Sequence, residues 1–100
     1  MTETKKLIEP RELIRVENQK GIIENSVNQF AHQMKRELLK HLDRPGWKRE
    51  KVEYLLARLT IELNELATAI MNNLERDEIK AECADVANFA MMISDIYKEG

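Results

Sequence analysis

Two pairs of carboxylates, each spaced three residues apart, are the side chains in this sequence best suited to chemistry. Glu62 and Glu65 lie in the stretch IELNELATAI, and Glu82 and Asp85 lie in ECADVANFAMMISD. Residues three apart on a helix share a face, with Cβ atoms about 5–6 Å apart, so each pair can bind a single cation. We therefore predict a magnesium site formed by all four side chains, with Mn²⁺ as a second cation that suits carboxylate ligands.

The second pair lies on an apolar helical pattern that we expect to be buried. Winding the residues at about 100° each gives one seam of five apolar side chains, Ile79, Val86, Phe89, Ile93 and Ile96. Glu82 fills the gap in this seam, and Asp85 and Asn88 lie at its edge. An ionised carboxylate removed from water without a partner is very costly, so these acids are expected to be neutralised, paired or bound to metal.

The first pair lies beside a similar pattern. The stripe expected to be buried here contains six apolar residues, Val52, Leu55, Leu59, Leu63, Leu66 and Ile70. Glu62 borders this stripe, and Glu65 lies farther round the helix. An alternative is that all four acids are residues at the border of the core, each paired with a nearby Lys or Arg. Two pairs on successive helices, one of them on a core seam, favour the metal site.

Three helices are expected to position these acids. The first is predicted over residues 22–42, on a single apolar stripe of Ile23, Val27, Phe30, Met34, Leu38 and Leu42. The sequence HLDRPGW then ends it, because the residue before a proline avoids the α region and Gly46 permits a sharp turn. The second helix is predicted over about residues 48–73 and the third over about residues 77–98.

The second and third helices are expected to form an antiparallel hairpin, because Asn72 and Asn73 leave only a short connection between them. The first acid pair lies roughly 11 residues before position 74 and the second roughly 10 after it. At a rise of about 1.5 Å per residue, the two pairs then lie at nearly the same height along the hairpin. The four carboxylates are therefore expected to converge on one space.

Clustered carboxylates that hold Mg²⁺ are typical of phosphoryl chemistry, in which a triphosphate substrate also requires cationic side chains. Lys51 and Arg58 share a helix face with Glu65, so both are candidates for contacting phosphate oxygens. The alternative for each is an ordinary solvated ion pair. Trp47 is a candidate for stacking on a base; the alternative is that it closes the end of the helical bundle.

The composition narrows the class of protein. A net charge of −2 provides no electrostatic basis for general nucleic-acid binding, so we expect no nucleic-acid partner. No apolar run reaches the roughly 18 residues of a membrane span, and the N-terminus lacks the apolar centre of a signal peptide. The single cysteine cannot form an internal disulfide and fits the reducing cytoplasm, where we expect the protein to be located.

The chain is expected to self-associate, because a chain of 100 residues buries only about two-thirds of its unfolded surface and a three-helix monomer would be marginally stable. Residues 1–21 are predicted to be an N-terminal arm, and residues 22–100 a helical domain. The pattern in the arm does not decide between a short helix and an extended segment. Its apolar residues Leu13, Ile14 and Val16 are candidates for packing on a partner subunit.

The spacing of the acids resembles a family signature. Glu62-x-x-Glu65, sixteen residues and then Glu82-x-x-Asp85 is similar to the ExxE…ExxD pattern of the MazG-like all-α nucleoside triphosphate pyrophosphohydrolases. The stretches ELNELATAI and ECADVANFAMMISD resemble the metal-binding helices of that family. The upstream stretch FAHQMKRELLKHLDRPGW resembles the short phage and bacterial members described as dATP/dGTP diphosphohydrolases. The resemblance covers about residues 28–98 and is weak as a guide to the substrate.

The resemblance implies an all-α antiparallel bundle, with three main helices per chain that pack into a four-helix core in a dimer or tetramer. It implies hydrolysis of a nucleoside triphosphate, dATP or dGTP in the similar members, to the monophosphate and pyrophosphate. The cation is expected on the four acids, with Glu62 as the catalytic residue that orients or deprotonates the attacking water. Asn88 is expected to contact metal or substrate.

One departure from the family pattern concerns the turn before Trp47. Similar proteins have a Lys–Gly–Gly-like turn at this point, whereas this chain has Arg44–Pro45–Gly46. Arg44 is therefore a candidate to replace the lysine in binding substrate. Two other functions remain open: a phosphoribosyl-ATP pyrophosphohydrolase on the same scaffold, and a non-catalytic helical interaction module, such as an antitoxin-like partner, whose acids only mimic a metal site.

Overall fold

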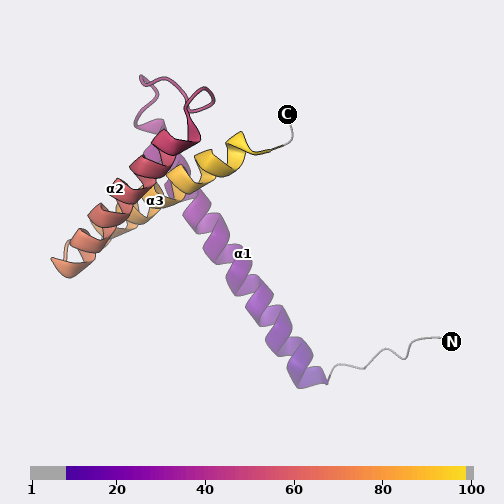
Figure 1. Ribbon diagram of the computed structural model, residues 1–100. Helices are drawn as coiled ribbons and strands as arrows, with labels where there is room; N and C mark the ends of the chain where they lie inside the picture. The colour runs from indigo at the N-terminus through magenta and orange to yellow at the C-terminus, as the bar shows by residue number, and fades with distance from the viewer. Residues whose placement is uncertain (1–8, 99–100) are drawn as a thin grey trace.

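The computed structural model describes residues 9–98, and this range contains three helices and no strand. Helix α1 spans Pro10–Leu39, α2 spans Val52–Met71 and α3 spans Arg76–Ile96. Helix α3 packs against α2 over its length and against the C-terminal part of α1 (Figure 1). The predicted all-α bundle with three main helices is confirmed. Over the described range, no helix is long and apolar enough to cross a membrane.

Helix α1 begins twelve residues earlier than predicted. The expected start at residue 22 is wrong, because Pro10 opens the helix rather than breaking it, and residues 10–21 are continuous with the rest of α1. Proline suits the first helical position, where its fixed φ matches the helix and its missing N–H costs no hydrogen bond. Gly21, expected at a boundary, lies inside the helix. Of the predicted arm, residues 1–8 lie outside the described range.

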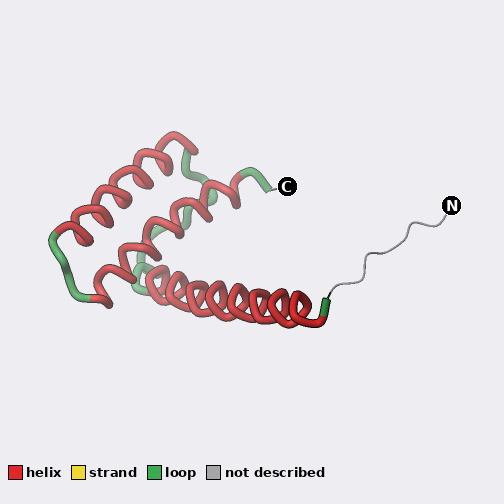
Figure 2. The backbone as a smooth tube through the Cα atoms, turned by 90° about the horizontal axis from the view of Figure 1, so that it is seen from below, coloured by secondary structure: helices red, strands yellow, loops and turns green. Residues whose placement is uncertain are grey.

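Much of α1 projects beyond the other two helices (Figures 1 and 2). Its 30 residues make a rod about 45 Å long. The radius of gyration is 19.0 Å, whereas a compact domain of this size has about 13 Å. Of the predicted α1 stripe, only Met34 and Leu38 are half-buried, and the other four are exposed: Ile23, Val27, Phe30 and Leu42. A single chain leaves most of this stripe uncovered, because α3 packs only against the C-terminal part of α1.

The connection between α2 and α3 has a defined geometry. Asn73 adopts a left-handed backbone conformation with φ of 53°, which Asn tolerates better than most residues. The N–H of Asn73 donates to the carbonyl of Ile70 at 3.1 Å, and the N–H of Leu74 donates to the carbonyl of Ala69 at 3.0 Å. This pair of hydrogen bonds is a Schellman motif, which satisfies the last carbonyls of α2 and turns the chain into α3. The predicted helix end at Asn72 and Asn73 is confirmed.

The core of the described chain is unusual because half of its six buried residues are polar. Leu55, Ala69 and Ala84 are buried, together with Glu37, Glu62 and Asn88. The three helices therefore enclose two carboxylates and an amide rather than a continuous apolar core.

The predicted buried stripe of α2 is partly wrong. Leu63 and Ile70 are exposed, and Glu62 and Ala69 are buried in their place. Both pairs, Leu63 with Ile70 and Glu62 with Ala69, are spaced seven residues apart, so helix geometry alone allows either pair to face inward. The small side chain of Ala69 allows α3 to approach closely, and this orientation places Glu62 inside the core rather than at its border.

Candidate functional site

Glu62 is the most enclosed of the four predicted metal-binding acids, with 6% of the residue exposed. Its Oε2 accepts a hydrogen bond from Nη2 of Arg58, one turn earlier, at 3.1 Å. The Arg58 guanidinium also lies over the ring of Phe89 on α3, 5.6 Å from the ring centroid, which is within cation–π distance. Arg58 therefore links the acid of α2 to the aromatic side chain of α3.

The pKa of Glu62 is raised to about 7. Burial is the largest cause, followed by a hydrogen bond with the Glu65 carboxyl and by the negative charges of Glu65 and Asp85. Arg58 lowers the pKa but does not offset these effects. The ionised form of Glu62 is therefore disfavoured, although a guanidinium lies beside it.

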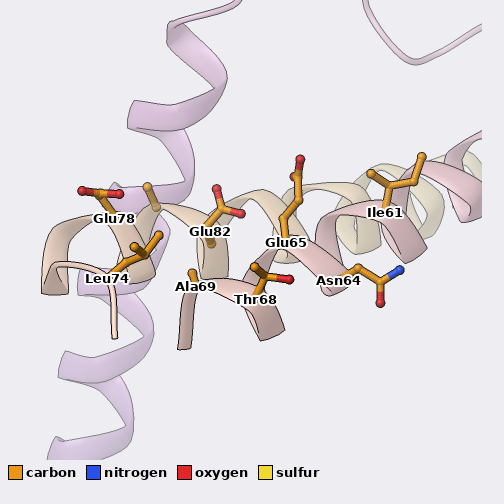
Figure 3. Close-up of a pocket in the computed structure, with 9 residues that line it drawn as sticks. Ile61, Asn64, Glu65, Thr68, Ala69, Leu74, Glu78 and Glu82 are labelled. Carbon is orange, nitrogen blue, oxygen red and sulfur yellow. The ribbon is translucent and has the colours of Figure 1, made fainter. Parts of the chain in front are cut away.

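Glu65 and Glu82 lie beside each other on α2 and α3, and their side chains extend to the same side of the hairpin (Figure 3). They border a pocket of about 540 Å³ between the two helices, near the connecting turn. Its lining residues are Ile61, Asn64, Glu65, Thr68, Ala69, Leu74, Glu78, Ala81 and Glu82. Burial raises the pKa of Glu82, and the charges of Glu65, Asp85, Glu37 and Glu78 raise it further.

Asp85 lies on the side of α3 that faces α1. Burial raises its pKa, and the next largest cause is the negative charge of Glu37 on α1. His41 and Lys40 act in the opposite direction but only partly offset the increase. Helix α1 and the residues just after it therefore contribute directly to the electrostatics of the predicted site.

Glu37 is a member of this cluster that the sequence reasoning missed. It is buried, with 7% of the residue exposed, and its carboxylate accepts hydrogen bonds from Lys40 at 3.1 and 3.2 Å and from Gln33 at 3.1 Å. A signal for it was available. Glu37 follows Phe30 by seven residues and Met34 by three, so it lies on the border of the apolar stripe of the first helix.

Asn88 is buried between α1 and α3, with 3% of the residue exposed. Its Nδ2 donates a hydrogen bond to the backbone carbonyl of Met34 at 3.1 Å, which fixes the orientation of the amide. Its Oδ1 has no hydrogen-bond partner among residues 9–98. A buried amide oxygen normally has a partner, so this acceptor is available to a bound water, ion or ligand.

The hairpin brings the two predicted acid pairs together. The pKa values of Glu62, Glu82 and Asp85 are all raised, and the charge of Glu65 contributes to each increase. The charge of Glu37, on α1, raises the pKa of Glu82 and Asp85 as well. Within the described part of the chain, no Lys or Arg forms a salt bridge with Glu65, Glu82 or Asp85. The alternative that each acid has its own basic partner therefore holds for Glu62 and Glu37 only.

The side chains do not form a closed metal cage. Nowhere between residues 9 and 98 do three or more His, Cys, Asp or Glu side chains stand close enough together to hold one metal ion. The arrangement is instead a group of mutually repelling carboxylates with one side open to the pocket beside Glu65 and Glu82.

Of the four residues predicted to bind substrate together with Asn88, only Arg58 contacts an acid of the cluster. Lys51 caps the start of α2, 11 residues or roughly 16 Å along the axis from Glu62. Arg44 is exposed in the segment between α1 and α2. Trp47 lies in the same segment and donates a hydrogen bond from Nε1 to Asp95 at 2.9 Å.

Asp95 explains the position of Trp47. Lys48 and Lys98 also contact the Asp95 carboxylate, each at 3.0 Å, and these three donors lower its pKa. Asp95 is ten residues beyond Asp85, roughly 15 Å along α3. These contacts attach the segment after α1 to the C-terminal end of α3, so Trp47 closes one end of the bundle.

No protein-family model, no curated protein and no solved structure matches this chain. The function must therefore be inferred from the residues and their arrangement.

Proposed function

We propose that this chain is a Mg²⁺-dependent hydrolase that cleaves a nucleoside triphosphate, with dATP and dGTP as the first substrates to test, to the monophosphate and pyrophosphate. The observation that supports this proposal most directly is the placement of Glu65 and Glu82 beside each other at one pocket, within electrostatic reach of the other two acids. Glu62, Glu65, Glu82 and Asp85 perturb one another across the hairpin, and three of them have no basic partner among the described residues. We further propose a cytoplasmic homo-oligomer, either a dimer or a tetramer.

The donor set fits a hard divalent cation. Carboxylate oxygens and one unpartnered amide oxygen, Asn88 Oδ1, are ligands that Mg²⁺ and Mn²⁺ prefer. The absence of a three-residue cage is compatible with Mg²⁺, which usually takes one or two protein carboxylates and completes its shell with water and substrate phosphates. Glu65 and Glu82, which lie beside each other at the pocket, are the residues proposed to hold it, and the charge of Asp85 adds to the negative potential at Glu82. A bound Mg²⁺ would neutralise phosphate charge and polarise the phosphorus–oxygen bond that breaks.

The other residues have separate proposed roles. Glu62 is enclosed and held by Arg58, so it is suited to orient the attacking water or accept its proton rather than to bind the substrate itself. Arg58 is the best placed of the predicted phosphate-binding cations, because it already lies beside the acids. The pocket of about 540 Å³ is open to solvent, so a nucleotide can approach Glu65 and Glu82 from outside the hairpin.

The direct test is pyrophosphate release from a panel of deoxynucleoside and nucleoside triphosphates with Mg²⁺, compared with the same reactions in EDTA. We expect release from at least one purine nucleotide, and none in EDTA. For the variant Glu65→Gln, the matched control is Glu53→Gln, because Glu53 is an exposed acid in the first turn of the same helix. Release that is equal with and without Mg²⁺, or absent for all substrates, contradicts the proposal.

A non-catalytic interaction module is the second candidate function, and the exposed apolar face of α1 is the observation that favours it. This candidate predicts that millimolar Mg²⁺ with nucleotide leaves the melting temperature unchanged. The enzyme predicts stabilisation, by about 2.7 kcal/mol when the ligand is at a hundredfold excess over its Kd. Adding phosphoribosyl-ATP to the substrate panel separates the two pyrophosphohydrolase activities.

A further inference from the structure

The N-terminal two-thirds of α1 has a heptad pattern. From Leu13 to Met34, one series of residues alternates steps of three and four: Leu13, Val16, Lys20, Ile23, Val27, Phe30 and Met34. These are the a and d positions of three successive heptads, the pattern by which one helix packs along another. Six of the seven are apolar. We refer to residues 13–30 of this series as the α1 seam.

The α1 seam has no partner within the described chain. Leu13, Ile23, Val27 and Phe30 are all exposed, with Val27 at 60%. This part of α1 also contains Gly21 and several β-branched residues, which are weak helix formers in water. A continuous helix of this composition therefore needs packing along its apolar side, which the hairpin of α2 and α3 does not provide (Figure 2).

The seam continues an interface that already exists. The next members of the same series are Met34 and Glu37, and both lie against α3: the Met34 carbonyl accepts a hydrogen bond from Asn88, and Glu37 acts on the pKa of Asp85. The C-terminal end of the stripe is therefore a helix-packing surface within the monomer. The seam extends that surface by about 27 Å beyond the point where α3 ends its contact.

We propose that the α1 seam pairs with the same segment of a second copy of this chain, in antiparallel orientation. The seam is complementary to itself when one copy is reversed. Reversal about the midpoint between residues 21 and 22 places position 13 opposite position 30 of the partner, 16 opposite 27, and 20 opposite 23. Each layer then joins an a position to a d position, as in antiparallel coiled coils. A second copy of the seam is therefore sufficient to cover the exposed apolar face of α1.

Lys20 sets the orientation. In a parallel pair, Lys20 would face Lys20 of the second copy inside the seam, where like charges repel in partly dry surroundings. In the antiparallel pair it faces Ile23 of the second copy and lies next to that copy's Glu24, an opposite charge. Among residues 9–98 of one chain, the only salt bridge of Lys20 is a loose one with Glu17, at 3.7 Å with both side chains mostly exposed. The charges of the seam therefore favour the antiparallel arrangement.

Disulfide trapping tests the orientation in the full-length chain, without nucleotide, so the result does not depend on the proposed activity. The native cysteine is first removed by Cys83→Ser. In that background we expect a variant with both Val16→Cys and Val27→Cys to form a covalent dimer under mild oxidation. The reason is that the thiol at position 16 of one copy lies opposite the thiol at position 27 of the other. The single variants Val16→Cys and Val27→Cys should not cross-link. Cross-linking by either single variant, or none by the double variant, overturns the proposal.

Sedimentation equilibrium with neighbouring substitutions tests the surface itself. Ile22 and Ile23 are adjacent isoleucines with similar exposure, 57% and 52%, but only Ile23 is on the seam. We expect Ile23→Asp to raise the Kd for self-association at least tenfold, while Ile22→Asp leaves it within about twofold of wild type. Far-UV circular dichroism checks that both variants remain helical. Equal effects of the two substitutions, or no effect of either, overturns the assignment of the seam.

Discussion

The acid cluster and the α1 seam show opposite relations between side-chain chemistry and burial. In the cluster, Glu37 and Glu62 are buried among other carboxylates. In the seam, apolar side chains such as Ile23 and Val27 are more than half exposed. Ordinary folding buries the second kind of residue and exposes the first. The proposed cation site and the proposed self-association would each account for one side of this contrast.

Different partners are proposed for the two regions. The cluster has an excess of negative charge, so a cation is the addition that would stabilise it. The seam has an excess of exposed apolar surface, so another helix is the addition that would stabilise it. Helix α1 takes part in both, because its C-terminal end carries Glu37 and its N-terminal part carries the seam. Substitutions can therefore test each region while the other serves as the internal reference.

The largest effect is expected from neutralising one acid of the cluster. Glu65→Gln keeps the shape of the side chain but removes the charge proposed to bind the cation. We expect turnover to fall on the order of a thousandfold, the upper range for losing one electrostatic contact in an active site. Pyrophosphate release at saturating Mg²⁺ measures this. Turnover near that of wild type, with the fold intact, would remove Glu65 from the site.

A substitution outside both regions provides the comparison for that experiment. Ile22→Asp lies outside both regions and should leave turnover unchanged, with circular dichroism like that of wild type. If Ile22→Asp reduces turnover as strongly as Glu65→Gln, the loss in the acid variant reports damage to the fold and not loss of a ligand. The two variants thus separate chemistry from folding.

The second largest effect concerns pH and the metal-free protein. Because the pKa of Glu62 is raised from 4.5 to about 7, the folded state binds this proton more tightly than the unfolded state. The resulting stabilisation is fully present below about pH 4.5 and is lost as pH rises through about 7, by on the order of 3 kcal/mol. Burial also raises the pKa of Glu82 and Asp85, so they act in the same direction.

Urea unfolding in EDTA at pH 5 and pH 7.5 measures this loss. In Glu62→Gln the difference between the two pH values should shrink markedly, whereas Glu53→Gln, an exposed acid on the same helix, should keep it. A difference that is the same in wild type and Glu62→Gln would show that burial of Glu62 carries no electrostatic cost.

The cluster also depends on the turn that sets its register. Asn73 has a positive φ in the Schellman motif between α2 and α3. Asn73→Val places a β-branched residue in a left-handed conformation, which should lower the free energy of unfolding by about 1–2 kcal/mol. Asn73→Gly removes that strain and should be as stable as wild type or more stable. Urea unfolding of the two variants distinguishes this backbone effect from loss of the asparagine side chain.

The sequence was informative where the chemistry was local. The asparagines at the end of α2 predicted the turn, and the count of residues on either side of it predicted that the two acid pairs meet. Both depend on helix geometry alone, which short sequence patterns express well. The four acids of the predicted site do influence one another across the hairpin.

The misses arose where tertiary packing decided between equivalent local patterns. Glu62 and Leu63 are both compatible with an inward face of α2, and the close approach of α3 at Ala69 selected Glu62. Glu37 lies on the first apolar stripe, but only the crossing of α1 over α3 brings it to Asp85. The predicted start of the first helix at residue 22 is wrong because Pro10 opens α1, and proline is typical of a helix start.

The smallest predicted effect tests the seam and is confined to it. Gly21 lies in the exposed helix with open space around an added Cβ, so Gly21→Ala should strengthen local helix structure by up to about 1 kcal/mol. Amide hydrogen exchange over residues 13–30 measures the gain, and residues 55–69 of the hairpin should be unchanged. Gly46→Ala is the matched control, because it too has open space but lies outside any helix. If Gly21→Ala leaves exchange in residues 13–30 unaltered, this part of α1 is not a stable helix in solution. The α1 seam would then not exist as a continuous helical surface in solution.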